Sequence, residues 1–153
     1  MATFPLHGGC HCGAVRYELL GPPSSVQHCH CENCRKISGE FTSTGAIISR
    51  RDIRISGAEN LKGYRTSPSF ERQFCQTCSC YLFAYEDSEQ DLLYFAPATI
   101  DGGVHPGHPQ GSESHIYVRS KANWEVIGDG LPQYDAASPD EIVTGLQRNS
   151  GDA

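Results

Sequence analysis

The cysteines of this chain fall into groups whose spacing is typical of metal ligands. Of the 8 Cys, all but one stand in three tight groups, which are Cys10-His11-Cys12, Cys29-His30-Cys31-Glu32-Asn33-Cys34 and Cys75-Gln76-Thr77-Cys78. Side chains two apart on an extended strand share a face, and a CxxC turn brings two sulfurs close enough to chelate one ion. Zinc takes four such ligands in a tetrahedron. Each group therefore predicts half of a zinc site or more.

The way in which these groups combine decides their chemistry. Four thiolates from distant parts of the chain make a closed, structural zinc site that cross-links the fold, and the residues are Cys10, Cys12, Cys75 and Cys78. The central group supplies three thiolates and leaves a fourth position open, as a catalytic zinc requires, and its residues are Cys29, Cys31 and Cys34.

Other uses of these cysteines stay open at this point. Disulfides suit an even number of cysteines, but bridges within CxC are strained and no export signal is evident. Iron–sulfur clusters also use cysteine-rich runs, although the spacings differ from the usual ferredoxin patterns. Both zinc sites could also be structural, with Cys80 or a histidine as the fourth ligand of the central group.

A zinc ion with three thiolates is a weak activator of water but suits a thiol substrate. Three thiolates leave the unit with a formal negative charge, which blunts Lewis acidity. A thiol bound to zinc is deprotonated outright and keeps its nucleophilicity. We therefore expect the open position to take a substrate thiol and present it to an electrophilic carbon. Arg35 and Lys36 follow Cys34 directly, and they could hold a substrate carboxylate or be a solvated basic pair.

The histidines do not complete a ligand set by spacing alone. His11 and His30 stand between ligands and, in extended backbone, point away from the metal face. His28 has no strong case as a ligand. The remaining candidates lie in or beside a stretch rich in glycine and proline, 101–114, which predicts a loop near the site, and they are His105, His108 and His115.

The elements that position these residues are mostly short strands. Apolar runs bounded by Gly, Pro, Ser or Asp predict strands at Val15–Leu19, Val26–His30, Phe41–Ser49, Ile53–Ser56, Phe70–Phe74, Tyr81–Tyr85, Leu92–Pro97 and His115–Val118. One helical turn is expected at Glu32–Lys36. Ser138-Pro139-Asp140-Glu141 resembles a capping box and predicts a short C-terminal helix with an apolar stripe at Ile142, Val143 and Leu146.

The predicted fold is mainly β, with short antiparallel sheets in a compact, zinc-stabilised single domain. The chain has 153 residues, which suits one domain, and we place the zinc-binding β domain at residues 1–135 and the C-terminal helix and tail at 136–153. A core this rich in glycine and proline needs an added constraint such as a metal.

Charge and hydropathy exclude two classes of partner. With 12 Lys and Arg against 18 Asp and Glu, the chain has a net charge of −6, whereas a nucleic-acid surface needs a basic excess. No apolar run approaches the roughly 20 residues that cross a membrane. Met1–His7 shows no basic segment followed by an apolar one, so we expect a cytoplasmic protein with reduced thiols. A homodimer stays open.

Longer motifs in the chain resemble a known family. The segments are Gly8–Tyr17, the CHCxxC run with Arg35-Lys36 and Ser38-Gly39 behind it, Phe74–Cys78, and Ile116–Gly130 with Lys121-Ala122-Asn123-Trp124 inside it. They are similar to the glutathione-dependent formaldehyde-activating enzyme family, which also includes centromere protein V. The resemblance spans about Gly8 to Asp135.

The resemblance implies two zinc sites and a carbon–sulfur lyase activity. It makes the four cysteines of the closed site structural ligands, and it makes Cys29, Cys31 and Cys34 catalytic ligands. The implied reaction joins glutathione and formaldehyde reversibly to S-(hydroxymethyl)glutathione, so the expected partner is a small-molecule thiol such as glutathione. The alternative is a non-catalytic, zinc-stabilised binding module, and a third hypothesis is a thiol redox sensor that uses Cys80.

Two departures and one aromatic pair complete the expectations. Ser79 stands where the family usually has glycine, and we expect strain in the turn there. Cys80 is expected to be a small buried residue. We expect Trp124 and Tyr117 to pack in the core or against a sheet rather than stack on substrate.

Overall fold

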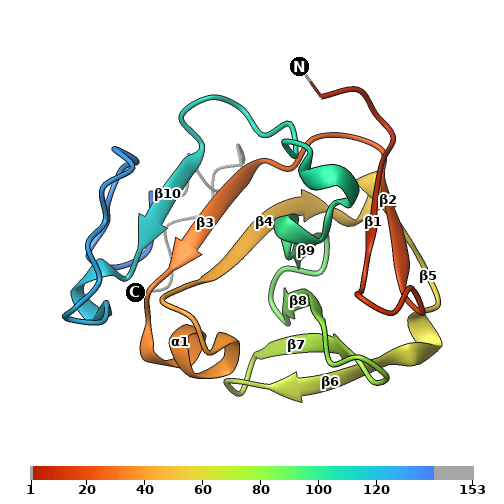
Figure 1. Ribbon diagram of the computed structural model, residues 1–153, viewed down its shortest axis with the longest axis horizontal. Coiled ribbons are helices and arrows are strands. Elements are labelled where there is room, and N and C mark those ends of the chain that lie inside the picture. The colour runs from red at the N-terminus through yellow and green to blue at the C-terminus, as the bar shows by residue number, and fades with distance from the viewer. Residues whose placement is uncertain (1, 140–153) are drawn as a thin grey trace. The chain divides into compact units, whose positions relative to one another are not determined.

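The computed structural model describes residues 2–139 and consists mainly of short strands (Figure 1). The chain divides into two compact units. The first unit comprises the chain up to Pro23 together with Ala46–Gly107, and the second comprises Ser24–Gly45 and the chain from His108 onward. Strand β4, Ser43–Ser49, begins in the second unit and ends in the first. Each unit is described separately below.

A three-stranded antiparallel sheet in the first unit follows the order β1-β2-β5. Its strands are β1 at Leu6–Gly9, β2 at Arg16–Leu19 and β5 at Ile53–Ser56. Along β2 the side chains alternate between buried and half-buried, so Tyr17 and Leu19 face the core. Gly8 lies opposite Tyr17, and a Cβ atom at Gly8 would lie 2.3 Å from the tyrosine ring. This contact explains a glycine in a strand.

The first unit also contains an antiparallel ladder in the order β4-β9-β8-β7-β6. Its strands besides β4 are β6 at Leu61–Arg65, β7 at Phe70–Cys75, β8 at Tyr81–Glu86 and β9 at Leu92–Phe95. The register of β7 on β8 shifts between Gln73 and Phe74, directly before Cys75. The irregularity redirects the chain where β7 ends in its cysteine.

Aromatic side chains form the centre of the first unit's core. The ring of Tyr17 meets Phe83 edge-on with centroids 5.8 Å apart and lies 5.7 Å from Phe95. All three residues are almost completely buried. The phenol of Tyr17 is satisfied by the hydroxyl of Thr99 at 2.9 Å, as a buried polar group requires.

The second unit has a parallel strand pair and the one α-helix of the described residues. Strand β3, Ser25–Cys29, pairs in parallel with β10, Glu113–Ile116, so that His115 lies opposite His28 and Ile116 opposite Cys29 (Figure 1). Helix α1 spans Glu32–Ser38 and ends at Gly39, whose φ of 71° suits a residue without Cβ. The chain thus passes from β3 into α1 through the central cysteines.

Single turns of 3₁₀ helix connect several of these elements. In the first unit they lie at Arg50–Asp52, Ala58–Asn60, Pro97–Thr99 and Asp101–Gly103, and in the second unit at Val118–Ser120. Within residues 2–139, no helix is both long and apolar enough to cross a membrane.

The mainly β prediction is confirmed, although the missed strands and one strand pairing differ from it. Each predicted strand range overlaps an observed strand, but β1 and β6 were not predicted. Both contain glycine, which weakens a strand pattern, and β6 is also largely exposed. The β3–β10 pair is parallel, whereas antiparallel sheets were expected. The predicted C-terminal helix lies almost entirely outside the described residues, and the boundary at residue 135 stays a prediction.

Candidate metal centres

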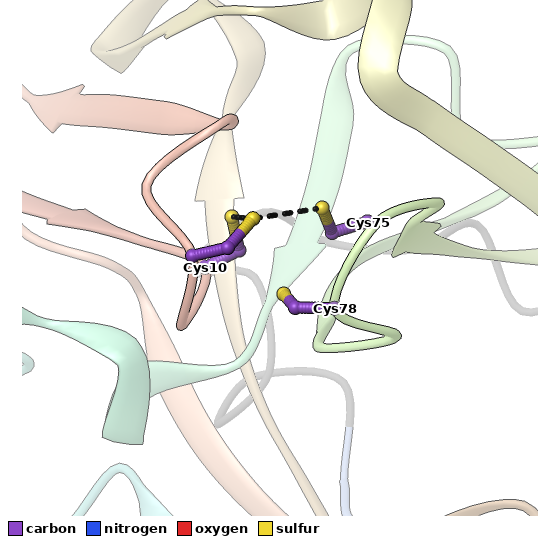
Figure 2. A group of neighbouring side chains, drawn as sticks. Cys10, Cys75 and Cys78 are labelled. Atoms are coloured by element: carbon purple, nitrogen blue, oxygen red, sulfur yellow. Dashed lines mark hydrogen bonds between the residues drawn. The ribbon is translucent and has the colours of Figure 1, made fainter.

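Four cysteines of the first unit converge in one cluster. Cys10 and Cys12 lie in the loop between β1 and β2, and Cys75 and Cys78 lie at the turn between β7 and β8. Figure 2 shows Cys10 on one loop and Cys75 and Cys78 on the facing turn, and its dashed line to Cys75 comes from the sulfur of Cys12. All four sulfurs lie within 4.8 Å of one another. The structure therefore brings together the four residues predicted as the closed site.

The sulfur separations in this cluster fit a tetrahedral metal. Cys12 Sγ lies 3.6 Å from Cys10 Sγ and 3.6 Å from Cys75 Sγ. Zn–S bonds of about 2.3 Å in a tetrahedron place two sulfurs about 3.8 Å apart. A disulfide needs about 2.05 Å, and all eight cysteines are free. The donor set and its spacing therefore fit a thiolate-bound metal ion, whereas no disulfide forms.

Backbone amides of the two loops favour thiolates in this cluster. The N–H of Val15 donates to Cys10 Sγ at 3.3 Å. Hydrogen bonds from the backbone N–H groups of Cys12 and Cys80 lower the pKa of Cys78 to about 6. Hydrogen bonds to the charged form stabilise it. The loops therefore favour a thiolate at Cys78, whereas burial and the neighbouring thiols raise the pKa of Cys12 to about 12.

The turn that carries Cys78 contains the departure noted in the sequence. Ser79 has a φ of 63°, a left-handed conformation that is unfavourable for a residue with a Cβ atom. Its N–H donates to Cys75 O at 2.8 Å, and Cys80 O accepts from Cys75 N at 2.9 Å. Cys80 itself is half-buried, and burial raises its pKa. This environment does not favour a reactive thiolate.

The central cysteines form a second cluster, within the second unit. Cys29 ends β3, Cys31 is the N-cap of α1, and Cys34 lies in the first turns of the helix. Their sulfurs lie within 4.8 Å of one another. The sulfur of Cys31 accepts the N–H of Cys34 at 3.4 Å, so the capping interaction of the helix also orients this sulfur. The strand end and helix start thus position all three predicted ligands.

Three thiols this close together cannot all ionise without a cation. The neighbouring thiols of Cys31 and Cys34, together with burial, raise the pKa of Cys29 far above its ordinary value. A divalent cation reverses this effect, because a thiol that coordinates it is deprotonated. Both clusters could therefore hold a metal ion, four sulfurs around one and three around the other.

His30 is fully buried and takes part in a hydrogen-bonded chain beside the second cluster. Its Nδ1 lies 3.0 Å from Glu125 Oε2, and its Nε2 lies 2.8 Å from His115 Nδ1. His115 Nε2 in turn lies 2.8 Å from Asp129 Oδ2. His30 therefore lies beside the ligands, as its spacing predicted, and His115 is the histidine of the loop region that reaches it. His11 is exposed.

A pocket of about 300 Å³ opens at the C-terminal part of α1. Arg35 and Lys36 line it, as do the aromatic side chains of Phe41 and Trp124. Trp124 is 77% exposed, so the expectation that it packs in the core was wrong. Its ring instead meets Phe41 edge-on with centroids 4.4 Å apart. Tyr117 is half-buried.

Sequence reasoning missed several residues of the second unit. Glu125 and Asp129 hold the histidine chain, while Phe41 and Glu40 line the pocket. A carboxylate far along the chain carries no spacing signal toward a histidine. The available clue was adjacency in the sequence. Glu125 directly follows Lys121-Ala122-Asn123-Trp124, a segment already singled out as part of a motif.

Comparisons with known proteins identify a family and named relatives of this chain. The chain matches the family of the glutathione-dependent formaldehyde-activating enzyme over residues 5–120. A relative from Halomonas elongata, whose name assigns it provisionally to that activity, is 30% identical over 147 residues, which cover 90% of this chain and 91% of the relative. An uncharacterized lyase of Schizosaccharomyces pombe is 31% identical over 99 residues, which cover 63% of this chain and 69% of the lyase.

A solved structure shares part of the fold. The crystal structure of a Rhodobacter sphaeroides protein superposes with a TM-score of 0.53 at 31% sequence identity, covering 66% of this chain and 92% of that one. The match to the family extends over most of the chain and includes both cysteine clusters. The chain therefore belongs to the glutathione-dependent formaldehyde-activating enzyme family.

Proposed function

We propose that this protein is a zinc-dependent carbon–sulfur lyase that joins a thiol of the glutathione type to formaldehyde, reversibly. In the forward direction the substrate sulfur forms a bond to the carbonyl carbon, the C=O π bond breaks, and the oxygen takes the proton that the thiol gave up. The names of the family and of its relatives support a lyase. The substrate pair and the metal are the finer parts of the proposal.

The difference between the two cysteine clusters carries this proposal. In the described residues, the cluster of the first unit has four sulfurs and that of the second unit has three. A metal with three protein ligands keeps a position for substrate, whereas a metal with four is closed. A zinc ion in the second cluster would lower the pKa of a thiol at that position. We accordingly assign Cys10, Cys12, Cys75 and Cys78 a structural role and Cys29, Cys31 and Cys34 the catalytic site.

The surrounding residues of the chain support the same assignment. Arg35 and Lys36 follow the last ligand on α1 and line the adjoining pocket, where they can attract a carboxylate of the thiol. The capping bond at Cys31 and the buried His30 hold the ligand segment in one conformation. Cys80 belongs to neither cluster, which supports an open position at the second one.

Catalysis is tested by exchange spectroscopy, since the two substrates also combine without an enzyme. ¹³C-formaldehyde and glutathione are held at equilibrium, and the exchange between free and thiol-bound carbon is measured by NMR with zinc-loaded protein. We expect faster exchange with the protein, loss of the acceleration in Cys31→Ser, and full retention in Cys80→Ser. An unaccelerated exchange, or an undiminished one in Cys31→Ser, would overturn the proposal.

The open position is tested separately by cobalt substitution. Tetrahedral thiolate-bound Co²⁺ absorbs in the visible range, and its spectrum responds to a change of ligand. With two Co²⁺ per chain, we expect an added thiol to alter about half of the absorption, and we expect Cys31→Ser to remove that response. A spectrum that no thiol alters would show two closed sites, as a binding module requires.

A further inference from the structure

The pocket beside α1 contains charges of both signs next to an exposed aromatic ring. Its residues are Arg35, Lys36, Gly39, Glu40, Phe41, Ala122 and Trp124, all from the second unit. Among the described residues, none of its three charged side chains forms an ion pair within 4 Å. Two cations and one carboxylate without ion pairs within residues 2–139 make this pocket complementary to a ligand that also bears both charges.

Arg35 contributes a guanidinium group to the lining of the pocket. Its Nε is buried and has no hydrogen-bond partner in the described protein. A buried donor without a hydrogen bond is destabilising. A carboxylate can satisfy a guanidinium with two parallel hydrogen bonds. Lys36, the next residue, is exposed and adds a second positive charge at the same place.

The opposite charge and the aromatic ring suit an ammonium group. Glu40 is exposed and follows Gly39, the residue at which α1 ends. Trp124 presents 77% of its surface to solvent, although its edge-to-face contact with Phe41 fixes the ring. Carboxylates and indole faces both attract ammonium groups. The pocket therefore offers partners for a cation as well as for an anion.

The walls of the pocket are tied to the three-cysteine cluster. Arg35 directly follows Cys34 on α1. On the other wall, Glu125 directly follows Trp124, and its carboxylate meets Nδ1 of His30, the residue between two of the ligands. The amine of Lys121 also donates to Glu125 O at 3.0 Å and closes this turn. A ligand seated in the pocket is thereby held in a defined place relative to the sulfurs.

We propose that this pocket binds the zwitterionic α-amino-acid end of the thiol substrate. Its carboxylate is held by Arg35 and Lys36, and its ammonium group is held between Glu40 and the face of Trp124. In glutathione the γ-glutamyl end has both groups on one carbon, whereas the glycyl end has a carboxylate alone. The pocket thus selects thiols with a γ-glutamyl group, an inference that rests on the proposed function.

The single tryptophan of the chain makes binding directly measurable. Trp124 is the 1 Trp in the sequence, so a change in intrinsic tryptophan emission reports on the pocket. The probe is γ-glutamyl-2-aminobutyryl-glycine, a tripeptide with a methyl group where glutathione has its thiol. We expect a saturable change in emission, and binding about tenfold weaker for the same tripeptide without its α-amino group. An unsaturable signal or equal binding of the two tripeptides would overturn the proposal.

Variants assign the two charges of the ligand to their partners. We expect Lys36→Gln to weaken the binding of both tripeptides about equally. We expect Glu40→Gln to abolish the preference for the tripeptide that has the α-amino group. Arg119→Gln is the matched control, because Arg119 is exposed, lies in the same unit and does not line the pocket. A preference that persists in Glu40→Gln, or an equal effect of Arg119→Gln, would contradict the assignment. Circular dichroism checks that each variant is folded.

The design separates this inference from the function on which it rests. The thiol-free probe requires neither zinc nor turnover. Selective binding without accelerated formaldehyde exchange would refute the proposed function and leave the pocket in place. Accelerated exchange without discrimination between the two tripeptides would refute the inference alone.

Discussion

His30 Nε2 lies 2.8 Å from His115 Nδ1, and both rings are buried. Each ring also meets a carboxylate through its other nitrogen, Glu125 for His30 and Asp129 for His115. Ionised carboxylates only accept hydrogen bonds, so both rings donate outward and a third proton must lie between them. Burial lowers the pKa of His30. This hydrogen-bonded chain thereby fixes the orientation of His30, which is flanked by the predicted ligands Cys29 and Cys31.

A substitution that breaks this hydrogen-bonded chain should weaken metal binding at the second cluster only. We expect His115→Phe to lower the zinc affinity there about 10–100-fold, the range found when groups that orient metal ligands are removed. His115→Asn, whose amide can replace the hydrogen bond at Nδ1, should restore part of it. Competition with a chromophoric chelator measures both sites, and the four-cysteine site is the internal control. Equal affinity in His115→Phe would contradict the orienting role.

Ser79 should be replaceable by glycine with a gain in stability. Its φ of 63° costs an L residue about 1–2 kcal/mol, whereas glycine loses about 0.4–1 kcal/mol through the greater entropy of the unfolded chain. We expect Ser79→Gly to raise the free energy of unfolding by about 0.5–1 kcal/mol, measured by denaturant unfolding at saturating zinc. Ser88→Gly is the control, since Ser88 is exposed with negative φ, and it should give no gain. A loss in Ser79→Gly would show that the serine stabilises the turn.

Some parts of this architecture follow from short-range pattern and others do not. The strand at Ile53–Ser56 and the four-cysteine cluster were predicted with their residues, because alternation and CxC or CxxC spacing are local signals. The strand at Leu6–Gly9 was missed because Gly8 is explained by groups distant in sequence, the ring of Tyr17 on another strand and the carbonyl oxygen of Thr99. The exposure of Trp124 was missed for a related reason. A large aromatic residue is usually packed, and only the tertiary structure shows that Phe41 covers it at one edge.

The ion pair between Arg16 and Asp101 should make stability depend on pH at the acid end. Arg16 Nη1 donates to Asp101 Oδ1 at 3.1 Å, and Nη2 donates to Oδ2. The guanidinium holds the pKa of Asp101 below its ordinary value. Its stabilisation is therefore fully present above the unfolded-state pKa, near 3.8, and is lost as the pH falls through the lower folded-state value.

Asp101→Asn should accordingly lower the Tm slightly at pH 7, since both side chains are about half exposed. The difference from the wild type should shrink as the pH falls from 4 toward 2. Thermal unfolding at several pH values measures it, and Asp91→Asn is the control because Asp91 forms no ion pair within residues 2–139. A difference that is independent of pH would exclude the ionised pair as its cause.

Gly57 should be required for the loop that carries Cys10 and Cys12. Its φ is +76°, and a Cβ atom there would lie 2.0 Å from the carbonyl oxygen of Ala14, in the loop itself. Gly103 has a φ of +63° with no atom within 4 Å of such a Cβ. We expect Gly103→Ala to cost about 0.5–1 kcal/mol, because the backbone strain of alanine at this φ exceeds its gain from a less flexible unfolded chain. Gly57→Ala should cost about 1–3 kcal/mol more from the clash. Gly57→Ala should also weaken zinc binding at the four-cysteine site. Equal effects of the two variants on the free energy of unfolding and on zinc affinity would mean that the loop accommodates the added Cβ atom.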